Sequence, residues 1–249
     1  MAGNRFKDLW LPEETKAIGE KATAQELLEV ANGTDQPGEA VYQVGRWAAP
    51  GAVNDFAGLL PSVNSNAAGP TAEALGGLLG AVNLDRAVEF AMSQPTDQMR
   101  AFAIAGVFDE LRSTANGERE IRALYATLPL AVQTADPVLF TYGNAIWGSD
   151  PNAALQALEG IASPQTKMLS LLALSRNSAS AAPEVAIAAI YASGLSDQGI
   201  YNHVSTIIQN WSAVDPQAAA KFLSTTQIIP PADVSKYAPI VASPGKSKG

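Results

Sequence analysis

The sequence predicts an all-α protein, a right-handed α/α superhelix (solenoid) of about six helix-turn-helix units of roughly 34 residues each. Three observations predict it. Alanine dominates the 47% hydrophobic content, and β-branched residues never alternate as strands require. A segment that combines Trp with Asp-Pro occurs twice. Proline breaks return at a constant interval. Together these patterns favour stacked pairs of short helices over a single compact bundle.

The repeated segment runs from Trp147 to Leu158 and returns, with one residue inserted after the Trp, from Trp211 to Leu223. Its Asp-Pro pairs, at 150–151 and 215–216, are 65 residues apart. Asp accepts hydrogen bonds from the free amides of a first helical turn, and Pro fits the first helical position. The segment therefore predicts a helix start, and we assign the same role to Pro70 after Gly69, to Pro137 and to Pro183.

The true period is about half of that interval, because related helix starts fall between the Asp-Pro pairs. The prolines that we expect to end the first helix of each unit agree, since they recur every 34 or 35 residues: Pro61, Pro95, Pro129 and Pro164. Proline lacks the amide that a helix interior needs, so it interrupts the helix and begins the turn into the next one. Each unit is thus interpreted as helix, turn, helix.

The expected helices follow from this period. First helices are predicted near residues 50–60, 85–93, 118–127, 150–161, 183–193 and 215–224. Second helices are predicted near 70–82, 97–112, 136–148, 165–176 and 197–211. A divergent pair near 23–30 and 38–47 would cap the N-terminal end. The predicted organisation is a charged N-terminal segment (1–22), a helical-repeat domain (23–229), and a C-terminal cap with a flexible tail (230–249) in which 234–241 form a capping turn.

Residues 38–224 resemble the tetratricopeptide class of helical repeats in period and hairpin organisation. The Trp here stands at the end of the second helix, whereas that family places it in the first, and the remaining pattern is Asp-Pro, one residue, Ala-Ala, three residues and Leu. This pattern resembles degenerate helical repeats of bacterial proteins. The resemblance implies a scaffold and supplies no catalytic residues.

Composition excludes several classes of function. A net charge of −8 and a pI near 4.7 argue against a nucleic-acid surface, which concentrates Lys and Arg on one face. The absence of cysteine excludes disulfides and thiolate chemistry. No apolar run reaches the roughly 20 residues of a membrane span, and the first residues lack the apolar core of a signal peptide. We predict a soluble protein without cofactor or metal, and its compartment stays open between cytoplasm and periplasm or secretion.

Candidate catalytic groups are few. His203 is the only histidine, which excludes a histidine-pair metal site, and a lone helical His is more often packed or solvated than catalytic. The carboxylate pairs at 109–110 and 13–14 could supply an acid and a base, but adjacent helical positions face apart, so we expect a solvated surface. The Gly76-Gly77 stretch lacks the context of a phosphate loop and is better explained by close helix packing.

The tryptophans that precede helix starts, Trp47, Trp147 and Trp211, could form an aromatic row for extended peptide or glycan, although packing between repeats is the stronger interpretation. The leading functional prediction is a non-catalytic scaffold that binds a protein or peptide partner. Its groove would run along the second helices and would be formed by exposed aromatic and polar residues: Tyr142, Trp147, Tyr201, Asn202 and Trp211. Alternatives are a helical accessory domain of a glycan-processing enzyme and a self-assembling structural protein.

Overall fold

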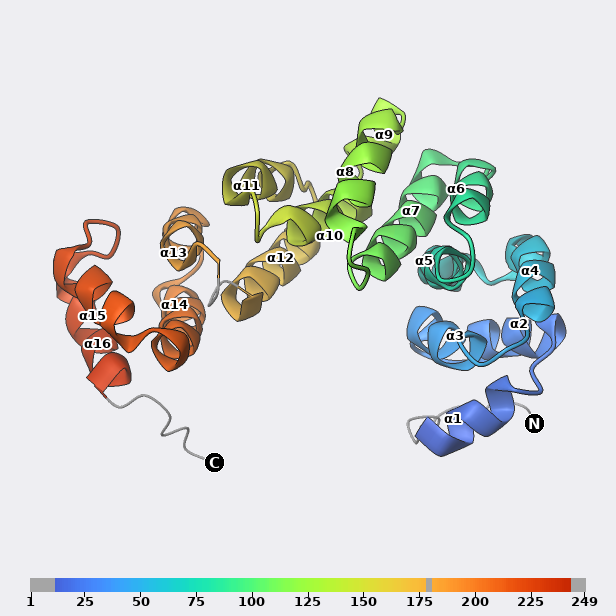
Figure 1. The fold of residues 1–249 in the computed structure, drawn as a ribbon, viewed down its shortest axis with the longest axis horizontal. Helices are drawn as coiled ribbons and strands as arrows, with labels where there is room; N and C mark the ends of the chain where they lie inside the picture. Colours follow the sequence, from blue (N-terminus) through green and yellow to red (C-terminus); the bar gives the residue numbers. More distant parts are fainter. Residues whose placement is uncertain (1–11, 178–180, 243–249) are drawn as a thin grey trace. The chain divides into compact units, whose positions relative to one another are not determined.

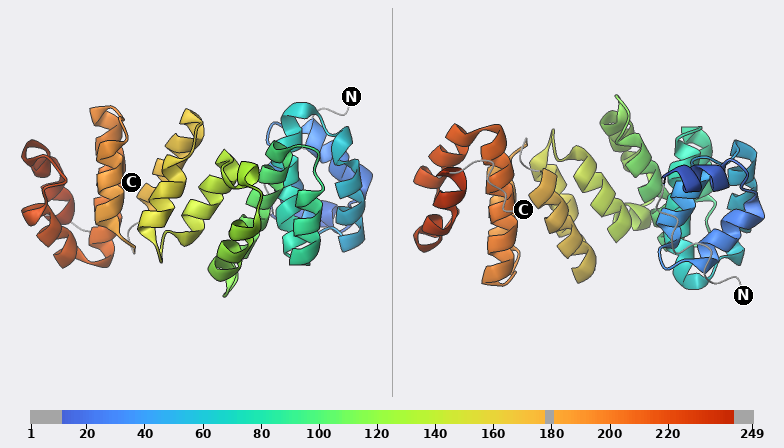
Figure 2. Two further views of the ribbon diagram at one scale, coloured as in Figure 1. Left: turned by 90° about the horizontal axis from the view of Figure 1, so that it is seen from above. Right: turned by 90° about the horizontal axis from the view of Figure 1, so that it is seen from below.

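The computed structural model describes residues 12–177 and 181–242, and every regular element in this part of the chain is a helix (Figure 1). The all-α prediction is therefore confirmed. The chain divides into two compact units, residues 1–145 and 146–249, within a stretch that the sequence predicts as one helical-repeat domain. Within residues 12–145, short turns join successive helices (Figure 2).

The elements of the first unit are α1 (Pro12–Gly19), α2 (Ala24–Gly33), α3 (Pro37–Gly45), α4 (Pro50–Leu59), the 3-10 helix η1 (Leu60–Ser62), α5 (Ser65–Gly80), α6 (Leu84–Met92), α7 (Asp97–Leu111), α8 (Gly117–Thr127), α9 (Leu130–Gln133) and α10 (Asp136–Ile146), which ends one residue past the division. The second unit contains α11 (Pro151–Glu159), α12 (Pro164–Asn177), α13 (Pro183–Ala192), α14 (Asp197–Val214), α15 (Pro216–Thr225) and α16 (Pro231–Ala242).

The Asp-Pro segments start helices as expected. Asp150 and Asp215 are N-cap residues whose carboxylates accept hydrogen bonds from the amides of Ala153 and Ala218, at 3.0 and 2.9 Å. The proline that follows each Asp is the first helical residue. A cap of this kind stabilises a helix by about 1 kcal/mol, so the repeated dipeptide fixes these two helix starts.

Several predicted boundaries are wrong. Pro70 does not start a helix, because α5 begins at Ser65 and continues through it. The burial of α5 on several sides outweighs the cost of about 3 kcal/mol for an internal proline. Pro164, expected to end a helix, is instead the first residue of α12, where its missing amide costs nothing.

Both ends of the described chain are helical, where the sequence predicts a charged segment at the N-terminal end and only a capping turn at 234–241 at the C-terminal end. Residues 12–19 form α1, which packs on α3, and Gly19 allows the chain to pass close to Val44 and Trp47. Residues 231–242 form α16, which packs on α14 and α15 and whose buried Tyr237 stacks on Tyr201 of α14. The rest of the predicted N-terminal segment and tail, 1–11 and 243–249, lies outside the described residues.

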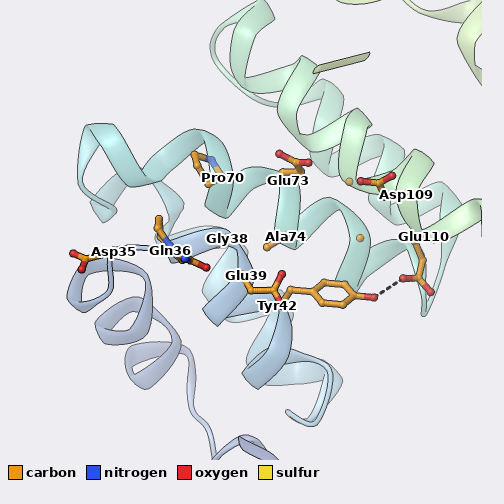
Figure 3. Close-up of a pocket in the computed structure, with 13 residues that line it drawn as sticks. Asp35, Gln36, Gly38, Glu39, Tyr42, Pro70, Glu73, Ala74, Asp109 and Glu110 are labelled. Carbon is orange, nitrogen blue, oxygen red and sulfur yellow. Dashed lines mark hydrogen bonds between the residues drawn. The ribbon is translucent and has the colours of Figure 1, made fainter. Parts of the chain in front are cut away.

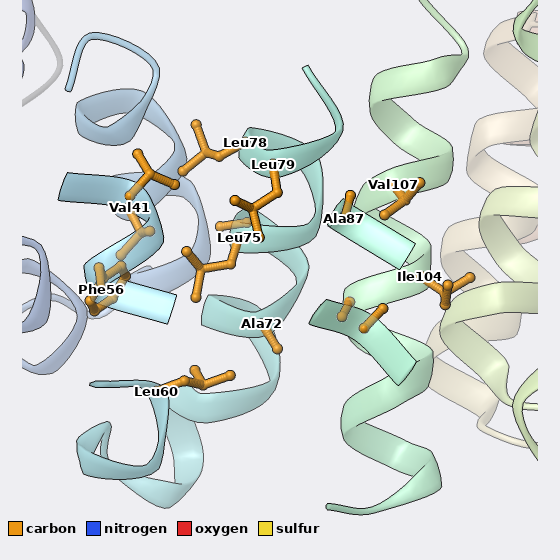
Figure 4. Packing of buried hydrophobic residues seen from close by; sticks show 14 of the residues in the cluster. Val41, Phe56, Leu60, Ala72, Leu75, Leu78, Leu79, Ala87, Ile104 and Val107 are labelled. Carbon is orange, nitrogen blue, oxygen red and sulfur yellow. The ribbon is translucent and has the colours of Figure 1, made fainter. Parts of the chain in front are cut away.

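The core of the first unit is organised around α5, which packs against α3, α4, α6 and α7 (Figure 4). Its buried leucines lie toward Val41 of α3 and Phe56 of α4, and Ala87 of α6 lies beside Val107 of α7. Each such aliphatic side chain contributes about 1.5–3 kcal/mol by leaving water. In the second unit, α14 has the same central role, with α12, α13, α15 and α16 around it.

Candidate functional site

A cleft of about 580 Å³ lies in the first unit, across α3, α5, α7 and the loop that precedes α3 (Figure 3). Ligand pockets of proteins are typically about 300–1,000 Å³, so this cleft is large enough to hold a small molecule or several side chains. Its lining contains five carboxylate residues and no lysine, arginine or histidine: Asp35, Glu39, Glu73, Asp109 and Glu110. The cleft is therefore strongly acidic.

Glycines allow α5 and α7 to approach closely beside this cleft. A Cβ atom on Gly106 would collide with the backbone oxygen of Glu73, and one on Gly76 would collide with the backbone oxygen of Ala103. The interpretation of the glycine-rich stretch as a close helix contact is thus confirmed. Gly77 and Gly106 also line the cleft, where the absence of side chains leaves room between the surrounding acidic residues.

Glu73 and Asp109 project from α5 and α7 at the same end of the cleft (Figure 3). Burial raises the pKa of the Glu73 carboxyl to about 7, and the nearby charge of Asp109 adds to this rise. Within the described residues, the Glu73 carboxyl has no hydrogen-bond or ion-pair partner. A partly buried carboxyl with this pKa changes charge near neutral pH.

Asp109 differs from Glu73 because a cation stands beside it. The guanidinium of Arg112 lies 3.0 Å from the Asp109 carboxylate. Although 46% of the Asp109 side chain is exposed, the walls of the cleft surround it, and this desolvation raises the pKa of its carboxyl while Arg112 opposes the rise. Asp109 is thus easier to ionise than Glu73 and helps keep Glu73 protonated.

Tyr42 and Glu110 meet close to Asp109, at the end of the cleft opposite Asp35 and Gln36 (Figure 3). The Tyr42 hydroxyl donates a hydrogen bond of 2.9 Å to Glu110 Oε2, and this contact fixes both side chains (Figure 3). Burial and the adjacent Glu110 carboxylate raise the pKa of the Tyr42 phenol. The tyrosine therefore stays neutral at physiological pH and presents its hydroxyl as a donor.

The 109–110 pair keeps solvent access, as the sequence predicts, since Asp109 is exposed and Glu110 is half-buried, but both residues also line the cleft. The two side chains still diverge, since Asp109 contacts Arg112 and Glu110 contacts Tyr42. Two neighbouring side chains of a helix can point in different directions and still both line a cleft that runs along that helix. Glu13 of the other pair is exposed on α1, and the side chain of Glu14 lies outside the described part.

The five predicted groove residues lie in two different units. Tyr142 is half-buried in the first unit, stacked on Tyr125 with ring centroids 3.8 Å apart. In the second unit, Tyr201 is 37% exposed beside the ring of Tyr237, and Asn202 accepts a hydrogen bond from Gln198. These three positions leave polar or aromatic atoms accessible.

The exposure expected of Trp147 and Trp211 is wrong. The Trp147 indole is buried and its Nε1 donates a hydrogen bond of 3.1 Å to the Ala181 carbonyl. Trp211 is also buried and packs on the Phe222 ring. Both indoles fill space between helices, as the packing interpretation expects, because a large aromatic ring gains most from leaving water. Trp47 differs, since 39% of it is exposed and the cations of Lys16 and Arg46 lie over its ring.

The remaining candidates do not form a site. His203 is half-buried in α14, and this burial lowers the pKa of its imidazole. Among residues 12–177 and 181–242, no group of three or more His, Asp or Glu residues has the geometry to hold a metal ion. None of the helices in this part of the chain is both long and apolar enough to cross a bilayer.

Sequence reasoning missed Glu73, Tyr42 and Glu39 as site residues. One signal was present: Glu39 and Glu73 are one repeat period apart and occupy equivalent second helices, α3 and α5. Equivalent positions of stacked helices lie side by side, so acids at that interval gather on one face.

Searches of known protein families, of curated proteins and of solved structures find no match to this chain.

Proposed function

We propose that this chain is a non-catalytic binding protein or scaffold whose acidic cleft takes a basic segment of a partner protein. The observation that carries the proposal is the lining of the cleft, five carboxylate residues without one basic side chain. We further propose that the helix pairs are about six units of a right-handed, tetratricopeptide-like superhelix, because their starts keep the period of roughly 34 residues.

The electrostatics of the cleft support a cationic ligand. Glu73 is desolvated, lies near Asp109, and has no counter-charge in the described chain. A lysine or arginine side chain would supply that charge in a partly buried place, where charge-assisted hydrogen bonds are about twice as strong as neutral ones. The cleft also spans the second helices α3, α5 and α7, the kind of helix on which the sequence places the groove.

The proposal is tested with a fluorescein-labelled, lysine-rich peptide and its glutamine analogue, measured by fluorescence anisotropy. We expect binding of the lysine peptide only, weakening with added salt because the contact is ionic. The double variant Glu73→Gln with Asp109→Asn should lose about tenfold or more in affinity. The matched control changes Asp85→Asn and Glu89→Gln, two exposed acids on α6 outside the cleft.

Binding should also depend on pH. The Glu73 carboxyl titrates near pH 7, so the lysine peptide should bind more tightly at pH 8 than at pH 6. Asp35, Glu39, Asp109 and Glu110 share the cleft with Glu73, and Arg112 pairs with Asp109. Equal affinity of the lysine and glutamine peptides, or an equal loss in the α6 control, would contradict the proposal.

A second candidate function is acid–base catalysis on a glycan, and the raised pKa of Glu73 is the observation that favours it. A general acid needs a second polar group placed to act with it, and the Glu73 carboxyl has no hydrogen-bond partner within the described residues. This candidate therefore ranks below binding. Turnover of a chromogenic glycoside that disappears in Glu73→Gln would reverse the ranking.

A further inference from the structure

A second, smaller hollow of about 200 Å³ lies in the first unit where the end of α3 and the start of α4 meet the turn from α5 to α6. Its walls are mainly apolar and include Val53, Leu78 and Leu79. This volume is below the range of drug-sized ligand pockets, so the hollow fits one side chain or a short terminal residue rather than a larger molecule.

The charge of this hollow is opposite to that of the acidic cleft. Arg46 and Arg86 line it, and its lining contains no aspartate or glutamate. In the part of the chain that the structure describes, no carboxylate lies within ion-pair distance of either guanidinium. The guanidinium of Arg46 lies over the Trp47 ring, with its central carbon 5.3 Å from the ring centroid. Two arginines without acidic partners beside an apolar surface are suited to an anion that carries an apolar group.

Tyr42 separates the two hollows, because it is the one residue that lines both. Its hydroxyl donates a hydrogen bond to Glu110 on the acidic side, while Arg46, the C-cap residue of α3, follows it by one helical turn. Residues four apart on a helix lie on the same face. A single extended chain that crosses the Tyr42 ring would therefore meet carboxylates on one side and guanidinium groups on the other.

We infer that the smaller hollow, lined by Arg46 and Arg86 across Tyr42 from the acidic cleft, binds the C-terminal carboxylate of a peptide segment. This inference rests on the proposed function, since the basic side chains of the same segment occupy the acidic cleft. It adds a direction to the bound chain: the C-terminus lies toward α4 and α6, and the basic residues lie toward α7.

The chemistry of the hollow favours a chain terminus over other anions. A C-terminal residue with an aliphatic side chain places its carboxylate and its apolar group on one carbon atom, which matches guanidinium groups beside Leu78 and Leu79. Planar carboxylates also accept paired hydrogen bonds from arginine. A phosphate would gain from the guanidinium groups but would leave the apolar wall without a partner.

The test compares two labelled peptides that differ in one group. Both are short, acetylated, lysine-rich and end in leucine, but one has a free carboxylate and the other a C-terminal amide. We expect the carboxylate form to bind the full chain about tenfold more tightly. Arg86→Gln and Arg46→Gln should each abolish this preference without weakening the amide form. Arg119→Gln, an exposed arginine of α8 outside both hollows, should change neither affinity.

Equal affinities of the two peptides for the wild-type chain would overturn the inference. If both peptides then still lose affinity in the Glu73→Gln and Asp109→Asn variant, the acidic cleft keeps its proposed function and only the terminal carboxylate site fails. If neither peptide binds the wild-type chain, the proposed function and this inference fall together. A preference for carboxylate that survives both arginine substitutions would also overturn the assignment to this hollow.

Discussion

Replacing Glu73 by Gln should stabilise the folded chain at pH 8 and leave its stability unchanged at pH 4.5. The folded state raises the pKa of this carboxyl from 4.5 to about 7, so between these values the folded chain holds a proton that the unfolded chain has lost. Stability therefore falls as the pH rises through this window. Glutamine has nearly the same shape and carries no charge at any pH, so it removes this loss.

The size of the effect follows from the pKa change. At 1.36 kcal/mol per pKa unit, the change corresponds to about 3 kcal/mol above pH 7. Water reaches the open cleft and screens part of the charge, so we expect a gain of about 1–2 kcal/mol in the free energy of unfolding at pH 8. At pH 4.5 the carboxyl is protonated in the folded state and half protonated in the unfolded state, so the expected gain is less than about 0.5 kcal/mol.

The assay is urea unfolding of the full chain followed by circular dichroism at both pH values. Glu89→Gln is the matched control, since Glu89 is exposed on α6 and its replacement should shift stability by less than about 0.5 kcal/mol at either pH. Equal stability of the wild type and Glu73→Gln at pH 8 would refute the reasoning. The same gain at both pH values would also refute it, because the cause would then be packing and not charge.

Three further changes test the packing and capping, and Gly51→Ala serves as a control for the first. Gly106→Ala should cost about 3 kcal/mol or more in unfolding free energy, because its Cβ collides with the rigid Glu73 backbone, whereas Gly51→Ala has open space and should be neutral or slightly stabilising. Trp147→Phe should cost about 1–3 kcal/mol, because it leaves the Ala181 carbonyl without its donor. Asp215→Ala should cost about 0.5–2 kcal/mol through the lost N-cap of α15, and a loss below that range would show that the cap contributes little. Urea unfolding measures all four variants.

Local chemistry explains why the helix positions could be predicted. The dipeptides at 150–151 and 215–216 carry a cap and a first helical residue within two positions, and they mark the starts of α11 and α15 to within one residue. Pro70 shows the limit of this reasoning. A proline usually ends or starts a helix, but α5 continues through Pro70 because its burial against neighbouring helices stabilises it.

The cleft could not be predicted in the same way, because it depends on contacts far apart in the sequence. Tyr42 and Glu110 are 68 residues apart in the chain, and nothing near either residue indicates that they meet. The raised pKa of Glu73 likewise depends on how closely α5 and α7 approach each other. Glycines allow this approach. The sequence predicts a close helix contact at the glycines but not which helix they contact. Local patterns identify helices, whereas burial and charge at a site follow from tertiary packing.

The buried Glu73 carboxylate lowers the stability of the free chain at high pH, and binding of the proposed cationic ligand should reduce this loss. This relation gives a last prediction. A cationic side chain that enters the cleft should lower the pKa of the Glu73 carboxyl, since an opposite charge favours the ionised form. The loss of stability between pH 4.5 and pH 7 should then shrink when the lysine-rich peptide is present in excess. Thermal unfolding with and without the peptide measures this change, and a bound ligand also stabilises the fold by mass action.

The pH dependence separates these two contributions. A ligand that binds without contacting Glu73 stabilises the fold by mass action alone, so it would raise the unfolding temperature equally at pH 5 and pH 8. A ligand that supplies the missing charge should raise it more at pH 8, where the unpaired Glu73 carboxylate destabilises the free chain. The excess at pH 8 should disappear in Glu73→Gln, which has no charge to compensate. An equal rise at both pH values in the wild type would place the peptide elsewhere on the molecule.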